Sequence, residues 1–90
     1  MDGPLALDNA VDMEAAKVKR IGGEVAGRAD VLVMPDLCAG NIFTKSLHYF
    51  AHLRQSGSIT GARIPVVMTS RTDTAEDKYY SILVSVLQSL

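Results

Sequence analysis

The sequence predicts an α/β fold in which helices and strands alternate along one domain. Two observations predict it: short apolar runs between polar or turn-forming residues, which are typical of buried strands, and segments with helical spacing of apolar side chains. The resulting order is helix, strand, helix, strand, strand and helix. The chain has 90 residues, which is near the lower limit for a single core.

The first part of the chain contains one predicted helix and one predicted strand. Residues 3–10 have a mixed character, so we expect an extended or turn-rich arm there. Residues 12–20 predict a helix because good helix formers run from an acidic start to a basic end, an order that suits the helix dipole. After Gly22 and Gly23, which end this helix, residues 30–36 enclose a continuous apolar run and predict a parallel strand buried on both faces.

The middle of the chain predicts a loop, a helix and two strands. Residues 39–41 form the expected loop, and the helix that follows reaches residue 54 or 55. Residues 58–62 and 64–69 predict the strands, the second with Pro65 near its start, where a strand tolerates proline. Apolar side chains share one face of the predicted helix: Ile42, Phe43, Leu47, Phe50 and Ala51.

The last predicted helix begins at Asp73, because Asp73 and Glu76 have the spacing of a capping box with Asp in place of Ser or Thr. We expect Asp77 to lie outside the core because it falls off the apolar stripe of this helix. The stripe consists of residues that recur at helical spacing: Ala75, Tyr79, Ile82, Leu83, Val86, Leu87 and Leu90.

Composition and charge exclude several classes of protein. With 48% hydrophobic and 21% charged residues, the chain is expected to be globular and soluble rather than disordered. Its formal net charge of −1 provides no general attraction for nucleic acid or for an anionic membrane. The N-terminus does not resemble a signal peptide, and no apolar run is long enough to span a membrane. A single cysteine, Cys38, excludes an internal disulfide and a cysteine-rich metal site, so we expect a cytoplasmic protein.

Two connections between a strand and a helix are candidate ligand sites: residues 35–41 and residues 69–73. In an open α/β sheet, ligands bind beyond the carboxyl ends of the strands, where helix N-termini point backbone N–H groups at the crevice. Near the second connection, Arg71 offers a planar guanidinium suited to phosphate, Ser70 a donor for developing negative charge, and Asp77 a proton acceptor. These are the groups that acyl transfer between phosphate and a thiol requires. The same pattern also suits an ordinary loop in which the Asp is only a partner of the helix dipole.

Four blocks of sequence, in consistent order and spacing from about residue 2 to the C-terminus, resemble signature stretches of the phosphate acetyl/butyryltransferase family. The blocks are residues 3–10 (GPLALDNA), residues 25–30 (VAGRAD), residues 35–42 (PDLCAGNI), and Thr69-Ser70-Arg71 with Glu76-Asp77 after it. Four linked blocks are more specific than any one of them. The first block is more similar to the butyryl branch of the family than to the acetyl branch.

The resemblance implies that residues 1–90 are the C-terminal part of a phosphate acyltransferase domain. Such a domain has a three-layer α/β/α, isocitrate/isopropylmalate-dehydrogenase-like fold, of which this chain would hold only a portion. It transfers a butyryl or similar short acyl group between coenzyme A and inorganic phosphate, with acyl-CoA as a substrate and no bound cofactor or metal. Carried over by position, Asp77 would take the proton of the CoA thiol, Arg71 would bind phosphoryl or carbonyl oxygens, and Ser70 would stabilise the transition state. Gly40 and Asn41 would shape the substrate cleft.

Two departures from the family pattern bear on this interpretation. Tyr49 stands where acetyl-specific relatives carry an arginine, which favours the butyryl branch. Family members are also several times longer, and their N-terminal part supplies most of the sheet and further phosphate- and CoA-binding residues. We therefore expect a fragment with little transferase activity of its own. We also expect a homo-oligomer, because a truncated sheet exposes an unpaired edge.

Other interpretations stay open from the sequence. The chain can instead be a non-catalytic remnant or an oligomerisation module with an anion-binding loop, or a small anion- or nucleotide-binding α/β domain. Cys38 lacks a neighbouring histidine, so we expect a packed residue rather than a nucleophile. His48 and His52 have the i, i+4 spacing of zinc ligands but no third ligand, so no metal site is expected. Lys45 either reaches an anion at the cleft or is solvated.

Overall fold

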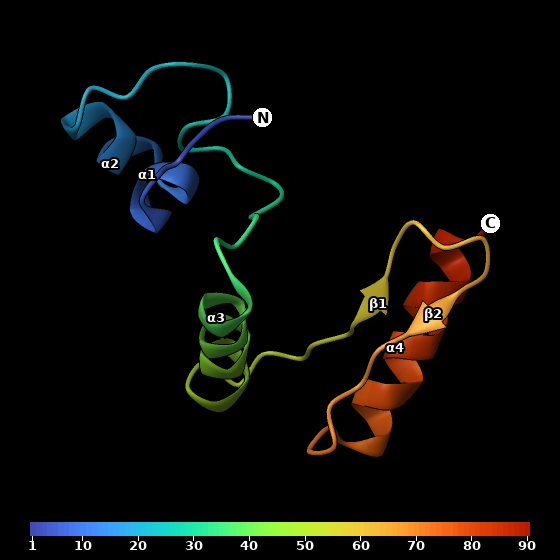
Figure 1. The fold of residues 1–90 in the computed structure, drawn as a ribbon. Helices are drawn as coiled ribbons and strands as arrows, with labels where there is room; N and C mark the ends of the chain where they lie inside the picture. The colour runs from blue at the N-terminus through green and yellow to red at the C-terminus, as the bar shows by residue number, and fades with distance from the viewer. The chain divides into compact units, whose positions relative to one another are not determined.

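The chain folds as two compact units, Met1–Met34 and Pro35–Leu90, in a computed structural model that describes residues 1–90 (Figure 1). Two short helices make up the first unit, and two longer helices with a hairpin between them make up the second. Helix and strand are mixed, which is compatible with the predicted α/β class. The elements, in order, are α1 (Leu7–Val11), α2 (Met13–Val18), α3 (Leu37–Tyr49), β1 (Ser58–Ile59), β2 (Val66–Val67) and α4 (Ala75–Gln88).

Asp12 joins the two helices of the first unit. Its backbone N–H donates to the carbonyl of Asp8 at 2.8 Å and so ends α1, while its carboxylate accepts the Glu14 N–H at 2.9 Å and caps α2. The helix predicted at residues 12–20 is confirmed, although α2 is shorter. The expected extended arm is wrong for residues 7–10, which belong to α1. A helix this short is not stable alone, so its formation depends on contacts that the local sequence does not reveal.

The segment after α2 returns to α1 and closes the first unit. Gly27 donates its N–H to the carbonyl of Asn9 at 2.8 Å, and Ala29 donates to the carbonyl of Ala10 at 3.0 Å. Gly27 has a φ of +80°, and a β-carbon there would lie 2.7 Å from the α-carbon of Met13. Only glycine satisfies both conditions. The buried apolar side chains of this unit are small: Ala10, Ala16 and Ala26.

Lys19 ties the end of α2 to α1. Its ammonium nitrogen lies 3.1 Å from Oδ2 of Asp8 and 3.2 Å from Oδ1 of Asn9. The hydrogen bond from Lys19 lowers the pKa of Asp8 below its usual value. A lowered carboxyl pKa stabilises the folded unit above the unfolded-state pKa, and this contribution is lost as the pH falls through the lowered pKa.

The apolar run at residues 31–34, expected to be a buried parallel strand, is not a strand. Val31 is 79% exposed and Val33 is 81% exposed. The prediction is wrong in this structure because a strand requires a hydrogen-bonded neighbour, and no other segment of the chain pairs with this run.

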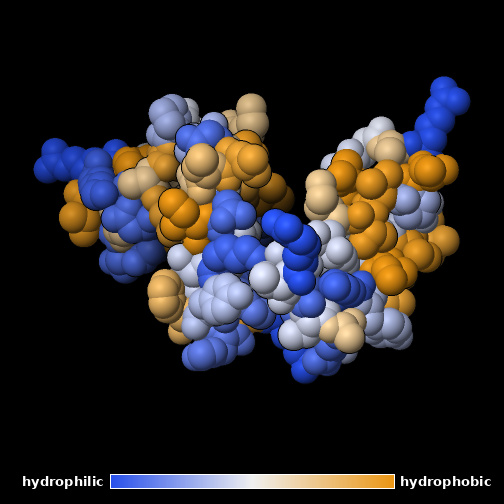
Figure 2. All heavy atoms as spheres, turned by 60° about the horizontal axis from the view of Figure 1, so that its bottom comes forward, coloured by the Kyte–Doolittle hydropathy of each residue, from blue (hydrophilic) through white to orange (hydrophobic).

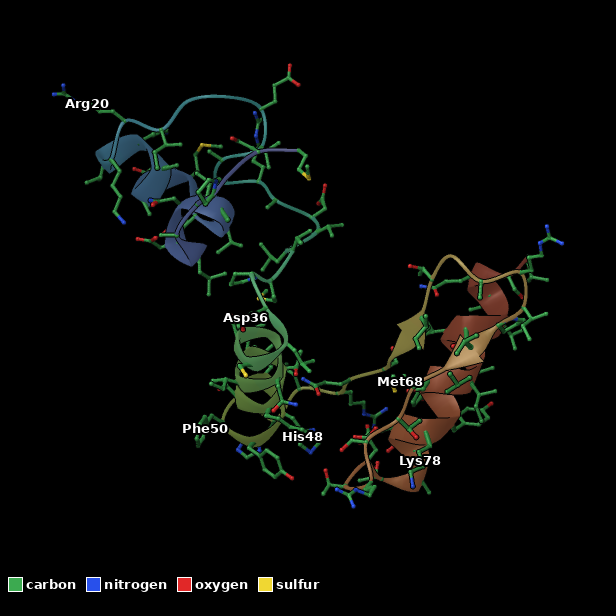
Figure 3. All side chains as sticks on the ribbon, in the orientation of Figure 1. Arg20, Asp36, His48, Phe50, Met68 and Lys78 are labelled. Atoms are coloured by element: carbon green, nitrogen blue, oxygen red, sulfur yellow. The ribbon has the colours of Figure 1, made fainter.

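Helix α3 begins earlier than predicted because Asp36 caps it, at the end of the helix labelled in Figure 3. The Asp36 carboxylate accepts the Ala39 N–H at 2.8 Å, and the Gly40 N–H donates to the Asp36 carbonyl at 3.1 Å. An Asp at this position satisfies backbone N–H groups that would otherwise lack partners. Residues 39–41 are therefore helical, and the prediction of a loop there is wrong.

Helix α3 also ends before the predicted residue 54 or 55. Its last residue is Tyr49, and His52 has a φ of +56°, which is left-handed and incompatible with a continuing helix. His48 and His52 thus do not share one helix, contrary to the predicted i, i+4 pair. Part of the predicted apolar stripe is exposed, with Ile42 at 68% and Phe50 at 84%.

The strands predicted at residues 58–62 and 64–69 are confirmed in position, but each is only two residues long. They form an antiparallel hairpin, and α4 packs against both strands. The sheet of this chain is thus two-stranded, with one covering helix. The paired residues are Ser58 with Val67 and Ile59 with Val66.

Thr74 caps α4 in a reciprocal arrangement with Asp77. The Thr74 hydroxyl accepts the Asp77 N–H at 3.1 Å, and Oδ2 of Asp77 accepts the Thr74 N–H at 3.3 Å. The capping box predicted for Asp73 and Glu76 is therefore wrong by one residue. Asp73 instead accepts the Ser70 N–H, which leaves Thr74 to cap the helix.

Helix α4 packs on the hairpin side with small polar residues rather than with its apolar stripe. Asp77, Ser81 and Ser85 are 7%, 1% and 3% exposed, so the expectation that Asp77 lies outside the core is wrong. The Ser81 hydroxyl accepts the Gly57 N–H at 3.0 Å and donates to the Asp77 carbonyl at 2.9 Å. The backbone at Gly57 approaches the helix this closely because the facing side chain is only a serine.

The apolar stripe of α4 is exposed as a consequence. Figure 2 shows hydrophobic side chains gathered over the part of the surface that belongs to the hairpin and α4. Leu87 is 65% exposed, and Leu90, two residues after the end of the helix, is 93% exposed. The other large exposed residues of the stripe are Tyr79, Ile82, Leu83 and Val86.

Candidate active site

The loop between β2 and α4 forms a tight turn that starts at Ser70. The Ser70 N–H donates to Oδ2 of Asp73 at 2.7 Å, and the Asp73 N–H donates back to the Ser70 carbonyl at 3.1 Å. A short Asp side chain that bonds a nearby backbone N–H is a common way to fix a turn. The Ser70 side chain is therefore attached to a backbone held at both ends of the turn.

Lys45, on α3, reaches this turn. Its ammonium nitrogen lies 3.2 Å from the Ser70 hydroxyl oxygen and 3.4 Å from the Thr72 hydroxyl oxygen. The two hydroxyl oxygens are 3.1 Å apart. One cation and two hydroxyls thus form a cluster, which we call the Lys45 cluster, between α3 and the loop before α4.

A hollow of about 650 Å³ lies beside the Lys45 cluster, within the second unit. Ser70 and Lys45 line it together with Asn41, which places two of the sequence-predicted residues, Ser70 and Asn41, at one cavity. Arg54 also lines it, and its guanidinium lies 2.9 Å from the Glu76 carboxylate. Lys45 forms no ion pair. The carboxylate that lines the hollow, that of Asp73, accepts the Ser70 N–H.

Asp77 opens onto a second hollow, of about 380 Å³. Thr74 and Tyr49 line this hollow, and so do His48 at the end of α3 (Figure 3) and His52 after it. Ser70 is not among its lining residues. The structure therefore does not bring Asp77 and Ser70 to the same hollow.

Arg54 lines both hollows. Arg71 is exposed, lines neither hollow and forms no ion pair. Gly40 lies in the first turn of α3, one residue before Asn41, and does not line the larger hollow. The roles predicted for Asp77, Arg71, Ser70, Gly40 and Asn41 remain predictions.

Sequence reasoning left the role of Lys45 open and missed Thr72 and Arg54. One signal was available for Lys45: it follows Asn41 by four residues, so both side chains share one face of a helix. The hydrogen bond from Lys45 to Ser70 could not be predicted from the sequence, because 25 residues separate the two.

The remaining candidates carry no site of their own. Cys38 is exposed, so the expectation of a packed residue is wrong. His, Cys, Asp and Glu side chains do not gather anywhere in groups of three or more that could hold a metal ion. None of the helices combines the length and the apolar character that crossing a membrane requires.

Comparisons with known proteins place these residues in a wider context. The chain matches the family described as Phosphate acetyl/butaryl transferase over residues 1–86. It is 54% identical over 89 residues to a probable phosphate butyryltransferase from Bacillus subtilis, and 51% identical over 85 residues to a phosphate acetyltransferase from Thermotoga maritima. These alignments cover 99% and 94% of this chain, but only 30% and 29% of the two relatives.

A solved structure is also similar to this chain in its three-dimensional fold. A branched-chain phosphotransacylase from Enterococcus faecalis V583 matches with a TM-score of 0.84 at 43% sequence identity. The match covers 98% of this chain and 33% of that one. The chain thus spans about a third of the length of the proteins that it matches.

Proposed function

Because the chain belongs to the phosphate acetyl/butaryl transferase family, we propose that it is the C-terminal part of a phosphate acyltransferase domain. The reaction transfers a short acyl group between coenzyme A and inorganic phosphate, with acyl-CoA and phosphate as substrates. One observation supports this proposal most directly: a hollow between α3 and the loop before α4 is lined by a hydroxyl and an unpaired ammonium, Ser70 and Lys45. Such a hollow suits an anionic group.

The proposed mechanism is direct transfer in a ternary complex. Asp77 takes the proton of the CoA thiol, and the thiolate attacks the carbonyl carbon of the acyl phosphate. The new C–S bond forms as the C–O bond to phosphate breaks, and phosphate leaves with the electron pair. Ser70 donates a hydrogen bond to the negative charge that develops, and Arg71 binds phosphoryl or carbonyl oxygens. Gly40 and Asn41 shape the wall of the cleft on the α3 side.

The acyl group is proposed to be butyryl or similar in size. Tyr49 supports this assignment, because it lines the same hollow as Asp77, at the position where the family resemblance implies an arginine in the acetyl branch. A phenol ring presents an apolar surface to an acyl chain, whereas a guanidinium does not. We also propose that the protein is cytoplasmic, because its proposed substrate, acyl-CoA, is used there.

The complete domain is proposed to have the three-layer α/β/α, isocitrate/isopropylmalate-dehydrogenase-like fold. The high similarity to a phosphotransacylase over nearly the whole chain supports it. The exposed run at residues 31–34 also suits a strand of a larger sheet, since its apolar side chains resemble those of strands buried on both faces.

We expect the full 90-residue chain alone to show little or no release of CoA thiol from butyryl-CoA and phosphate. A ternary complex needs walls on both sides of the cleft, and a two-stranded hairpin with one covering helix does not provide them. A chimera in which this chain replaces the matching segment of an active relative should restore turnover. An inactive chimera with a normal fold contradicts the proposed function, and robust turnover by the chain alone contradicts the need for further walls.

A second candidate, an oligomerisation module, is favoured by the exposed apolar stripe of α4. We expect the chain to self-associate as its concentration rises, because burying this stripe removes apolar surface from water. Light scattering should show the association, and Leu87→Glu together with Val86→Glu should abolish it. The matched control is Lys78→Glu, which changes the net charge by the same amount as the two glutamates but lies on the same helix outside the stripe. A chain that stays monomeric at every concentration contradicts the oligomerisation module.

A further inference from the structure

The acceptor positions of the Ser70 hydroxyl are already occupied. A hydroxyl oxygen accepts two hydrogen bonds and donates one. The Ser70 oxygen accepts from the Lys45 ammonium at 3.2 Å and from the Thr72 N–H at 3.4 Å. The Ser70 hydroxyl can therefore make a further hydrogen bond only as a donor. In this structure the nearest hydroxyl acceptor is the Thr72 oxygen, 3.1 Å away.

Lys45 is suited to control this hydroxyl. It is half-buried, it lines the larger hollow, and it is held to the turn from the opposite wall, on α3. An ammonium that donates to a hydroxyl oxygen polarises the O–H bond and makes its proton a stronger donor. The neighbouring cation, Arg54, is engaged with Glu76.

We propose that Lys45 is a positioning residue that makes Ser70 a hydrogen-bond donor toward a phosphate group in the larger hollow, and that its ammonium adds positive charge at the same place. A phosphate oxygen would accept the hydrogen bond from the Ser70 hydroxyl in place of the Thr72 oxygen. Thr72 then keeps its hydrogen bond from Lys45. This assignment rests on the proposed acyl transfer, because it identifies phosphate as the occupant of the hollow.

The alternative is that Lys45 only holds α3 against the loop. Its bonds to Ser70 and Thr72 do connect these two parts of the second unit. A purely structural role predicts that loss of Lys45 loosens the fold. It does not predict that the effects of Lys45 and Ser70 on phosphate binding depend on each other. A thermodynamic coupling between the two side chains therefore separates the two roles.

The test is a titration of the full chain, labelled with ¹³C and ¹⁵N, with inorganic phosphate at constant ionic strength. In the wild type, phosphate should shift the amide resonances of Ser70 and Thr72 and the ε-methylene resonance of Lys45, but not that of Lys78. Lys45→Met should weaken phosphate binding by about tenfold or more, the typical worth of a hydrogen bond to a charged group. Lys45→Arg, which keeps the charge, should recover most of the affinity. Lys78→Met, on α4 (Figure 3), is the matched control.

The double variant distinguishes positioning from simple addition of charge. If Lys45 acts through the Ser70 hydroxyl, Lys45→Met should weaken binding much less in a Ser70→Ala background than in the wild type. Fully additive effects overturn the proposal, as does a Lys45→Met chain that binds phosphate like the wild type. A wild-type Lys45 resonance that responds to coenzyme A but not to phosphate also overturns it, even if Lys45→Met does not fold. None of these readouts uses turnover, so an inactive chimera bears on the acyl transfer alone.

Discussion

Replacing Asp77 by asparagine should lower the turnover of the chimera by about 10²- to 10⁴-fold, the usual contribution of a general base. Asparagine keeps an oxygen that can accept the Thr74 N–H, so the cap of α4 survives while the proton acceptor is lost. The thiol-release assay with butyryl-CoA and phosphate measures the effect. Thermal unfolding should show that the fold is retained.

Thr74→Ala is the matched control for this change. It removes the other half of the capping box and should cost about 0.5–2 kcal/mol of stability. It leaves the Asp77 carboxylate in place, so turnover at a temperature well below the unfolding transition should stay close to that of the parent chimera. If Asp77→Asn retains full turnover, Asp77 is not the base. If Thr74→Ala lowers turnover as much as Asp77→Asn does, the loss in Asp77→Asn is not evidence for a base.

Replacing Ser81 by leucine should destabilise the second unit on the order of 2–4 kcal/mol, because it overpacks a closed contact and removes a hydrogen bond. Ser81 is 1% exposed, and its hydroxyl accepts the Gly57 N–H. The leucine side chain has no space between α4 and this backbone, and the Gly57 N–H loses its partner. Chemical denaturation of the full chain, followed by circular dichroism, measures the change.

Ile82→Ser is the opposite test on the adjacent residue. Ile82 is 52% exposed on the apolar stripe, so its loss should cost less than about 1 kcal/mol in the monomer, as for most exposed positions. The apolar pattern of the sequence predicts the reverse order, with Ile82 in the core and Ser81 outside it. A chain that tolerates Ser81→Leu but is unfolded by Ile82→Ser would show that α4 packs with its apolar stripe.

The helices were predictable where the controlling contacts are local. The helix at residues 12–20 and the last helix both begin beside an acidic or hydroxyl side chain that bonds an N–H two or three residues on. Such pairs can be recognised in the sequence, although the choice between Asp73 and Thr74 as the cap depends on which of them the turn at Ser70 uses. Asp36 makes the same kind of bond with the Ala39 N–H, so α3 begins before the helix that is predicted to follow residues 39–41.

The packing was not predictable, because it depends on contacts between distant segments. The face of α4 that is buried is selected by the backbone at Gly57, which lies 24 residues from Ser81. The absence of a strand at residues 31–34 has the same kind of cause, since strand pairing is never decided by one segment alone. At the candidate site, Ser70 and Asn41 could be chosen from sequence, whereas the bond from Lys45 to Ser70 required the folded chain.

The reciprocal cap at the start of α4 makes the two oxygens of the Asp77 carboxyl group different from each other. Oδ2 of Asp77 is anchored by the Thr74 N–H, which fixes the rotation of the group, while Oδ1 has no bond within the chain. In the proposed mechanism, a thiol can approach Oδ1 without displacing the hydrogen bond that Oδ2 accepts from Thr74. The first turn of α4 would thus orient the carboxylate of the proposed base, because a backbone N–H of that turn holds one of its two oxygens.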